Sequence, residues 1–195
     1  MHSVRTCRAG DLADRIEELA ALRIAVFREW PYLYDGTLDY ERRYLATYLE
    51  NPRARVVVAD ADGCLIGMST CLPLGDEVDE FKKPIVRAGH DPDRGFYFGE
   101  SVLLPDHRGK GIGREFMEAR LEAARDEGGM DYCCFCAVVR AEDDPRRPSD
   151  YRPLDPFWMK MGFAPMDGVE ASFDWKEVGA SDETPHRMRF WMRRL

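Results

Sequence analysis

A run of strand, glycine-rich turn, helix and strand occupies the middle of the chain and restricts the possible folds more than any other feature. Residues 96–104 have the pattern of a strand, residues 112–127 have the periodicity of a helix, and residues 132–139 form the longest uninterrupted apolar run. Two strands joined through a helix are expected to lie parallel and adjacent in one sheet. The segment therefore predicts one parallel strand pair.

The remaining segments predict further strands and helices around this pair. Strands are expected at 3–8, 55–60, 64–74, 169–178 and 188–194, and helices at 12–28, 40–50 and 154–161. The turn signal Asp62-Gly63 joins two of the strands into an antiparallel hairpin. The polar stretch 75–94 reads as an insertion that could hold one short helix. We expect a single α/β domain over residues 1–195, built on a mixed, mostly antiparallel sheet with helices on both faces.

The charge balance excludes several classes of partner. The 195 residues include 28 Lys and Arg against 36 Asp and Glu, which gives a net charge of −8. A protein that wraps nucleic acid needs clustered positive charge, so this acidic chain is not expected to bind nucleic acid. The longest apolar run falls far short of the roughly 20 residues that span a bilayer, and the first residues lack the apolar region of a secretory signal. We therefore expect a soluble cytoplasmic protein with no membrane partner.

The cysteines indicate packing and not metal binding. They are Cys7, Cys64, Cys71, Cys133, Cys134 and Cys136. Cys133 and Cys134 are adjacent in a strand and would point to opposite faces of the sheet. The close spacing of the last three, with no second pair and no nearby His, is not a zinc pattern. We expect reduced, buried thiols and no metal site.

The turn from Arg108 to Arg114 is the segment that carries chemistry. Its alternate glycines let the backbone approach a ligand closely, and the free amides at a helix N-terminus attract anionic oxygens. The turn also contains three cations: Arg108, Lys110 and Arg114. These features favour a diphosphate cradle over a turn that merely caps the helix. Neither the Walker pattern nor the dinucleotide-binding glycine pattern matches, although another nucleotide phosphate-binding protein remains a rival interpretation.

These residues resemble a known family. Arg108-Gly109-Lys110-Gly111-Ile112-Gly113, after a strand that ends in Val-Leu-Leu-Pro, is similar to the acyl-CoA-binding motif of the GNAT N-acetyltransferase superfamily. Residues 157–163, Phe-Trp-Met-Lys-Met-Gly-Phe, are similar to that family's Phe-Tyr-x-x-x-Gly-Phe segment. The close resemblance covers about Phe96 to Phe163, and the expected order of strands is also the family's order.

The resemblance implies where acetyl-CoA binds. In the family a bulge splays the two parallel strands, and the pantetheine arm inserts between them. The implied cosubstrate-binding residues are Val102 and Leu103 on the strand and Arg108, Gly109, Lys110, Gly111, Ile112, Gly113 and Arg114 in the turn. A main-chain N–H near Val102 or Leu103 would polarise the thioester carbonyl. The chemistry implied is direct attack by a primary amine on the acetyl carbon, with no covalent enzyme intermediate.

The resemblance also implies roles for two catalytic residues. Glu100 lies where many family members keep an acidic base, and the alternative is a solvated or ion-paired strand carboxylate. The usual tyrosine acid is replaced by Trp158, whose indole cannot release a proton at useful pH. Tyr151 is the candidate replacement and Cys136 a weaker one, while either could serve packing alone. His107 is expected to be a surface residue of the phosphate loop.

The acceptor side is less constrained by the sequence. Tyr32, Tyr34 and Asp35 form an aromatic and acidic cluster that could enclose a cationic amine, or the tyrosines could simply pack the first two helices together. Four arginines could bind an anionic group of the acceptor or balance nearby acids: Arg140, Arg146, Arg147 and Arg152. We expect a small-molecule amine first and a peptide amine second.

Two further possibilities remain open from the sequence. A non-catalytic acyl-CoA-binding or sensor protein on the same fold is the alternative function, because Trp158 replaces the expected acid. The closing strand around residues 188–192 could pair across a homodimer or pack within one chain.

Overall fold

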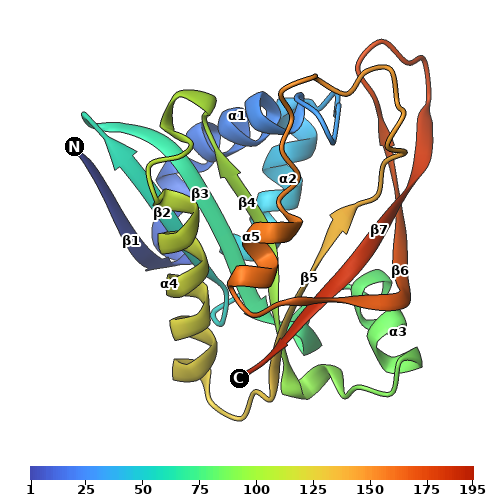
Figure 1. The fold of residues 1–195 in the computed structure, drawn as a ribbon. Helices are drawn as coiled ribbons and strands as arrows, with labels where there is room; N and C mark the ends of the chain where they lie inside the picture. Colours follow the sequence, from blue (N-terminus) through green and yellow to red (C-terminus); the bar gives the residue numbers. More distant parts are fainter.

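The computed structural model describes residues 1–195 and contains one seven-stranded sheet (Figure 1). Its strands are β1 (His2–Arg8), β2 (Arg55–Ala61), β3 (Cys64–Pro73), β4 (Gly95–Leu103), β5 (Tyr132–Val138), β6 (Ala164–Lys176) and β7 (Glu183–Arg194). They lie in the order β1-β2-β3-β4-β5-β7-β6. β4 and β5 are parallel and all other neighbours are antiparallel, so the predicted mixed sheet with one parallel pair is confirmed.

Helices cover both faces of the sheet, as predicted. α1 (Ile16–Phe27), α2 (Leu38–Leu49) and α3 (Asp79–Arg87) pack on one face, and α4 (Ile112–Glu127) and α5 (Asp155–Lys160) pack on the other (Figure 1). Short 3-10 turns cover Ala9–Arg15, Leu74–Asp76, Pro92–Arg94 and Pro105–His107. None of the helices combines the length and the apolar character needed to cross a lipid bilayer.

The strands alternate between two buried layers, because successive side chains of a strand point to opposite faces. Cys134 and Cys136 on β5 join the core beneath α1 and α2, whereas Cys133 and Phe135 join the core beneath α4 and α5. All six cysteines are free thiols. The expectation that all are buried is wrong for Cys64, which is exposed because it directly follows the hairpin turn, and for Cys7, which is only partly buried on β1.

The boundaries differ from the prediction where the hydrophobic pattern is weak. The first helix begins at Ile16, since Ala9–Arg15 forms a 3-10 turn. β7 begins before the predicted residue because Glu183–Arg187 are mostly polar and show no apolar alternation, and β6 begins earlier because a register shift between Pro165 and Glu170 interrupts its pattern. The insertion contains α3, whose Phe81 stacks against Phe173 of β6 with ring centroids 4.6 Å apart.

Candidate active site

β4 and β5 pair over a short stretch and then separate. Gly95–Tyr97 pair with Tyr132–Cys134, while β4 continues to Leu103 and β5 continues to Val138. Main-chain groups of β4 beyond Tyr97 are therefore open on the side of β5. The splayed parallel pair expected from the family resemblance is confirmed.

A bulge in β4 lies at the point of separation. Gly99 and Glu100 together face the single residue Thr70 of β3. The main chain of Glu100 is fixed on both sides, because its N–H donates to Thr70 Oγ1 at 3.1 Å and its carbonyl accepts from Ser69 Oγ at 3.0 Å. A bulge bends its strand and redirects a side chain. Here it turns Glu100 into the layer beneath α1 and α2.

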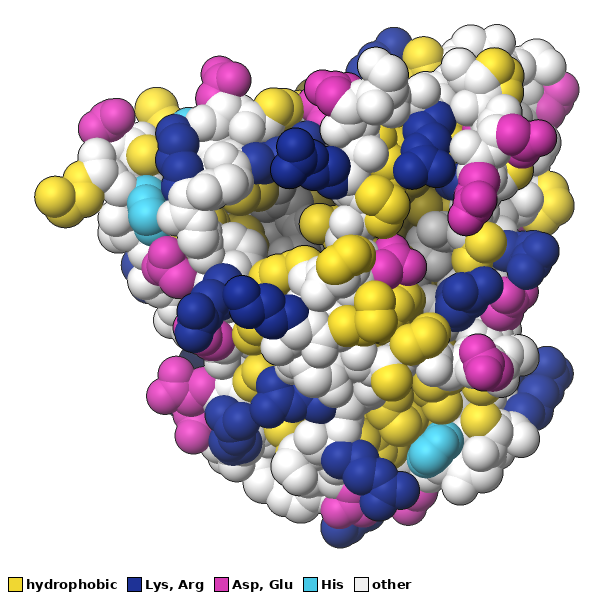
Figure 2. All heavy atoms as spheres, in the orientation of Figure 1, with side chains coloured by type: hydrophobic (Ala, Val, Ile, Leu, Met, Phe, Trp, Pro, Cys, Tyr) yellow, Lys and Arg dark blue, Asp and Glu magenta, His cyan; other side chains and the backbone are white.

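The surface is hollowed next to this separation. Figure 2 shows a depression between α4 and α5, above β4, with Lys and Arg side chains on several sides. The start of α4 faces the same region in Figure 1. The strand separation, the bulge and the glycine turn therefore meet at one place on the molecule.

The glycine turn has the geometry of a bare amide cradle. Gly109 and Gly111 have φ angles of 75° and 91°, which side chains disfavour, and Gly111 is the N-cap of α4 without any side-chain cap. A Cβ added at Gly109, Gly111 or Gly113 would meet no atom within 4 Å. The amides of residues 109–113 donate no hydrogen bond to another part of the chain. Such amides at a helix N-terminus are suited to phosphate oxygens.

The basic side chains of the turn have different partners. Arg108 donates to the carbonyl of Leu103 at 3.0 Å and pairs with Glu29 at 2.8 Å, while Arg114 pairs with Glu118 at 2.7 Å. Lys110 is exposed and has no acidic partner. The fit to a diphosphate therefore rests on the main-chain amides and Lys110. The guanidinium groups of Arg108 and Arg114 are already engaged.

Glu100 is part of a buried polar cluster. Arg23 of α1 lies between Glu100, 2.8 Å from its Oε2, and Glu41 of α2, to which it donates a short hydrogen bond. The guanidinium also stacks over the Tyr44 ring, 4.1 Å from the ring centroid. Glu41 is fully buried and Glu100 is 6% exposed. One oxygen of each carboxylate, Oε1, is buried without a hydrogen-bond partner.

A chain of hydroxyl groups leads from Glu100 to a third buried carboxyl. Tyr44 donates to Glu100 Oε2 at 3.0 Å, and its hydroxyl is 3.3 Å from that of Tyr48. Tyr48 donates to Glu77 Oε1 at 2.7 Å. Burial raises the pKa of both tyrosines well above the ordinary value and also raises the pKa of Glu77. The tyrosines therefore remain neutral hydroxyls at physiological pH.

The sequence contains a signal for this cluster, because charged residues occupy core positions of two helices. Arg23 is four residues after Leu19 and four before Phe27, on the apolar stripe of its helix. Glu41 precedes Leu45 by four residues on the buried face of α2. A charged residue at a core position of an amphipathic helix predicts a buried, paired charge.

The aromatic and acidic residues of the predicted acceptor cluster occupy different surroundings. Tyr32 packs between Phe27 and Trp175, at centroid distances of 4.7 and 6.0 Å, and burial raises its pKa. Tyr34 contacts Tyr40 edge to face, and burial followed by the Glu41 charge raises its pKa. Asp35 instead turns outward.

Asp35 forms surface ion pairs with Arg28 at 2.8 Å and Lys176 at 3.2 Å, which lower its pKa. Because this carboxylate is already paired with two cations, it would bind a substrate ammonium group only weakly. The fully buried Glu41 is instead the acid whose charge acts on Tyr34.

The candidates for the proton donor are also separated by the structure. Trp158 packs against Phe135 and Trp191, with both centroid distances 5.0 Å. Tyr151 lies on the loop before α5, edge to face with Trp30 at 6.0 Å, and burial raises its pKa. Cys136 is 3.2 Å from the hydroxyl of Tyr97 within the core. His107 lies in the 3-10 turn beside the cradle, half-buried, with no side-chain hydrogen bond.

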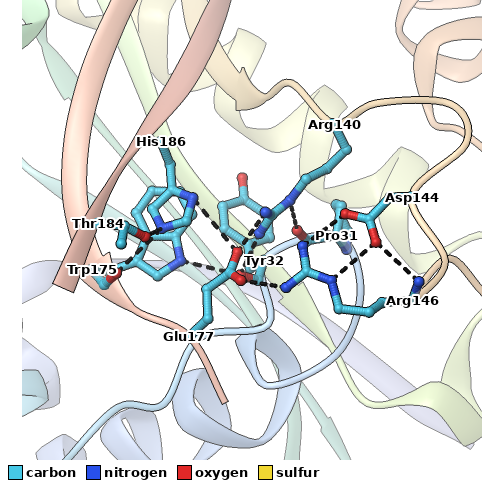
Figure 3. Close-up of polar contacts among 9 residues, drawn as sticks. All are labelled: Pro31, Tyr32, Arg140, Asp144, Arg146, Trp175, Glu177, Thr184 and His186. Atoms are coloured by element: carbon cyan, nitrogen blue, oxygen red, sulfur yellow. Dashed lines mark hydrogen bonds and ion pairs between the residues drawn. The ribbon is translucent and has the colours of Figure 1, made fainter. Parts of the chain in front are cut away.

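A polar cluster fixes the loop that contains Tyr32 (Figure 3). Arg140 donates to the carbonyls of Pro31 and Tyr32 at 2.6 and 2.8 Å and pairs with Glu177 at 2.5 Å. Trp175 donates to the same Tyr32 carbonyl at 3.1 Å. Of the four arginines noted in the sequence, Arg140 thus secures the 30–34 segment.

The same cluster extends to the following loop and to β7. Arg146 bridges Asp144, at 2.7 Å, and Glu177. His186 stacks on Trp175 and lies 3.6 Å from Glu177. Burial opposes ionisation of Glu177, but the bonds from Arg146 and Arg140 outweigh it and lower the pKa. Sequence patterns did not reveal this cluster because its members lie far apart along the chain.

Comparisons with known proteins agree with this geometry. The Acetyltransferase (GNAT) family model matches residues 19–148, about two thirds of the chain, so the protein belongs to the GNAT acetyltransferase family. The match includes the cradle, the splayed strands and the buried cluster. No curated protein sequence matches significantly.

Solved structures share the fold at low sequence identity. The acetyltransferase of the GNAT family from Streptococcus pneumoniae has a TM-score of 0.58 and 13% identity, with full coverage of both chains. The ribosomal-protein-alanine N-acetyltransferase from Brucella melitensis has a TM-score of 0.59 and 15% identity, with 99% of each chain covered. yncA from Salmonella typhimurium, solved with its cofactor acetyl-CoA, has a TM-score of 0.56 and 17% identity, covering 100% of this chain and 94% of its own.

Proposed function

We propose that this protein transfers an acetyl group from acetyl-CoA to the primary amine of a small molecule by direct attack. The observation that carries the proposal is the position of Glu100. Its buried carboxylate lies at the bulge where β4 leaves β5, next to the strand residues that would hold the thioester. A carboxylate at that point can accept the proton that an attacking amine must lose.

The donor half of the reaction would be performed by main-chain groups. The bare amides of residues 109–113 and the positive end of α4 would hold the diphosphate of acetyl-CoA, and the exposed Lys110 would add charge. The open edge of β4 beyond Tyr97 offers N–H and C=O groups to the pantetheine arm. An N–H near Val102 or Leu103 would stabilise the oxyanion that forms at the acetyl carbon. Acetyl-CoA supplies the activated thioester.

The proton chemistry would depend on the two oxygens of Glu100. Arg23 and Tyr44 bind Oε2, which leaves the buried Oε1 without a partner and available to take a proton from the ammonium group. An amine attacks only as the free base, and a lysine-like amine has a pKa of roughly 10. A nearby base therefore raises the reactive fraction at neutral pH.

Tyr151 is the proposed donor to the departing thiolate. Burial raises its pKa, so the phenol keeps its proton at neutral pH. Trp158, at the usual tyrosine position, is packed between two aromatic rings and has an indole that cannot release a proton. Solvent could protonate the thiolate if Tyr151 does not reach it.

The charge and shape of the site favour a small cationic amine. Two carboxylates, Glu41 and Glu100, pair with one buried guanidinium, Arg23, and a third carboxyl, Glu77, lies at the far end of the tyrosine chain. A cluster with more acids than bases attracts an ammonium ion. The cluster around Arg140 and Glu177 fixes the neighbouring 30–34 segment and the loop after β5, which supports a small molecule over an extended peptide.

A thiol-release assay tests the function. Acetyl-CoA is incubated with a panel of primary amines, and free CoA is detected with a thiol reagent. We expect turnover with at least one cationic small molecule. Glu100→Gln should lower kcat on the order of 100-fold while leaving CoA affinity unchanged. Glu127→Gln, which removes a surface carboxylate paired with Arg53, is the matched control and should leave both unchanged.

The non-catalytic alternative predicts a different result. The packed Trp158 favours an acyl-CoA-binding or sensor protein, since the usual acid is missing. Tight CoA binding without turnover of any amine would support this alternative. Equal losses of turnover and CoA affinity in Glu100→Gln would remove Glu100 from the role of base.

A further inference from the structure

We propose that Tyr44, Tyr48 and Glu77 form a proton relay that removes the proton from Glu100 between turnovers. The inference rests on the proposed function, in which Glu100 takes a proton from the amine. Glu100 is buried and its main chain is fixed at the bulge, so its carboxyl group has little contact with bulk water. The hydrogen-bonded hydroxyls on α2 provide a route to the other side of the cluster.

The geometry of the relay follows from the helix. Tyr44 and Tyr48 are four residues apart on α2, which places their hydroxyls on the same face. The three oxygen–oxygen distances from Glu100 to Tyr44, from Tyr44 to Tyr48 and from Tyr48 to Glu77 are 3.0, 3.3 and 2.7 Å. Glu77 begins the insertion between β3 and β4, where it also accepts from the N–H of Val78 at 3.2 Å.

Each step of the relay conserves protons. A hydroxyl can accept one hydrogen bond while it donates another, so Tyr44 and Tyr48 each receive a proton from one side and release one to the other. The protonated carboxyl of Glu100 turns to present its O–H to Tyr44, and Tyr44 turns its own O–H from Glu100 to Tyr48. Tyr44 then passes a proton to Tyr48, and Tyr48 passes one to the carboxylate of Glu77. One proton leaves Glu100, one arrives at Glu77, and both tyrosines end neutral.

The charges around Glu77 set the direction. Burial raises the pKa of Glu77, and the negative charge of Glu100 raises it further. When Glu100 takes the proton of the amine, that charge disappears and Glu77 releases its own proton to solvent more readily. The relay then returns Glu100 to the carboxylate. The cycle keeps one proton between the two carboxyl groups.

Other charged and titratable groups face the relay from every packed element. Those that face Glu77 are Tyr44 and Tyr48 on α2, Tyr97 and Glu100 on β4, Cys134 and Cys136 on β5 and Lys82 on α3. Those that face Glu100 are Arg23 on α1, Glu41 and the same tyrosines on α2, and Arg120 on α4. Burial raises the pKa of the tyrosines and of both thiols. At neutral pH, Glu77 and Glu100 are therefore the groups between which the proton moves.

The relay assigns positioning roles to Tyr48 and Glu77, since neither touches the substrate in the proposed reaction. The test is the pH profile of kcat in the wild-type protein, Tyr48→Phe and Glu77→Gln. The wild-type kcat should rise with pH through the raised pKa of Glu77, because only an ionised Glu77 can receive the proton. Both variants should lose this acid limb and fall on the order of tenfold in maximal kcat, a smaller loss than removal of the base itself.

Tyr132→Phe is the matched control. Tyr132 is another buried tyrosine, and its hydroxyl donates to the carbonyl of Asp91 at 2.9 Å, away from the relay. Tyr132→Phe should therefore retain the wild-type pH profile of kcat. If Tyr48→Phe did not fold, Glu77→Gln would still break the chain at its far end.

The outcomes separate this inference from the proposed function. The proposed function would stand if the wild type turned over an amine and Glu100→Gln lost that activity. Unchanged pH profiles in Tyr48→Phe and Glu77→Gln would then overturn the relay alone. A ¹³C titration of the carboxyl groups of the protein alone needs no turnover. We expect the pKa of Glu77 to fall in Glu100→Gln, because the negative charge of Glu100 raises it. A pKa of Glu77 that is unchanged in Glu100→Gln would contradict the relay.

Discussion

Arg23 supplies the positive charge for two buried acids of the site. It is the one cation that bonds directly to both Glu41 and Glu100, and its guanidinium is covered by the ring of Tyr44. Removing one partner of a buried ion pair leaves an uncompensated charge, which costs far more than the pair itself contributes. We therefore expect the arginine to stabilise the fold whatever the acceptor is.

Arg23→Met tests this role through stability. The variant leaves two carboxylates without a cation, so the free energy of unfolding should fall by about 3–5 kcal/mol at neutral pH. The loss should shrink at acidic pH, where protonation removes the unpaired charges. Urea denaturation at several pH values measures both effects.

Arg42→Met is the matched control for Arg23→Met. Arg42 pairs with Glu17 and Asp39 on the surface, so its replacement should change stability far less. Equal losses in the two variants would contradict the central role of Arg23.

At the scale of the residue, the sequence predicted candidates better than it predicted their partners. The family motif makes Glu100 a candidate, whereas no pattern indicates Arg23, Glu41 or Glu77 as its partners, because pairing between α1, α2 and β4 is a tertiary property. Asp35 illustrates the opposite case. Its position beside two tyrosines favoured an acceptor role, but its side chain reaches Arg28 and Lys176 on the surface.

At the scale of the element, the turn into α4 combines two different requirements for glycine. Gly111 has a φ of 91° and needs glycine for its backbone conformation. Gly113 lies in the first turn of α4 without a positive φ, so its lack of a side chain serves only to keep the backbone bare. Alanine substitution separates these requirements.

Gly111→Ala and Gly113→Ala should shift stability in opposite directions. Gly111→Ala forces a side chain into the left-handed region and should cost roughly 1–2 kcal/mol of unfolding free energy. Gly113→Ala improves helix propensity and should add up to about 1 kcal/mol. Both should weaken CoA binding if the diphosphate rests on the bare backbone. Thermal denaturation and calorimetric CoA titration measure these effects, and undiminished CoA affinity in both variants would count against the cradle.

Elements with a strong pattern were predicted closely from the sequence, and those without one were not. α4 has the predicted bounds, since its apolar face and flanking glycines are unambiguous. The parallel pairing of β4 and β5 followed from their connection through α4. The bulge at Gly99 and Glu100 has no local pattern, because it exists only in the register with β3.

At the scale of the whole molecule, the separation of β4 from β5 divides the sheet into two halves. β1 to β4 form one half and β5, β7 and β6 the other, joined by a short parallel contact. The buried acids lie beside that contact. The pH dependence of folding should therefore report on the interior of the site as well as on the surface.

Glu77 gives a signed prediction for this pH dependence. Its pKa is raised above the ordinary value of 4.5 by burial, so the folded protein binds this proton more tightly than the unfolded chain. The resulting stability is present below pH 4.5 and is lost as the pH rises through the folded pKa. Glu77→Gln removes the loss, so its stability relative to wild type should increase with pH above 4.5. A difference that stays constant in urea denaturation from pH 4 to 8 would contradict a raised pKa.

The most direct test of the account is a crystal structure of the protein with coenzyme A. We predict the two linked phosphates on the amides of the turn between Arg108 and Arg114, and the pantetheine arm between β4 and β5 with its sulfur beside Val102. A coenzyme bound elsewhere, or a complex in which β4 and β5 pair along their full length, would contradict the account.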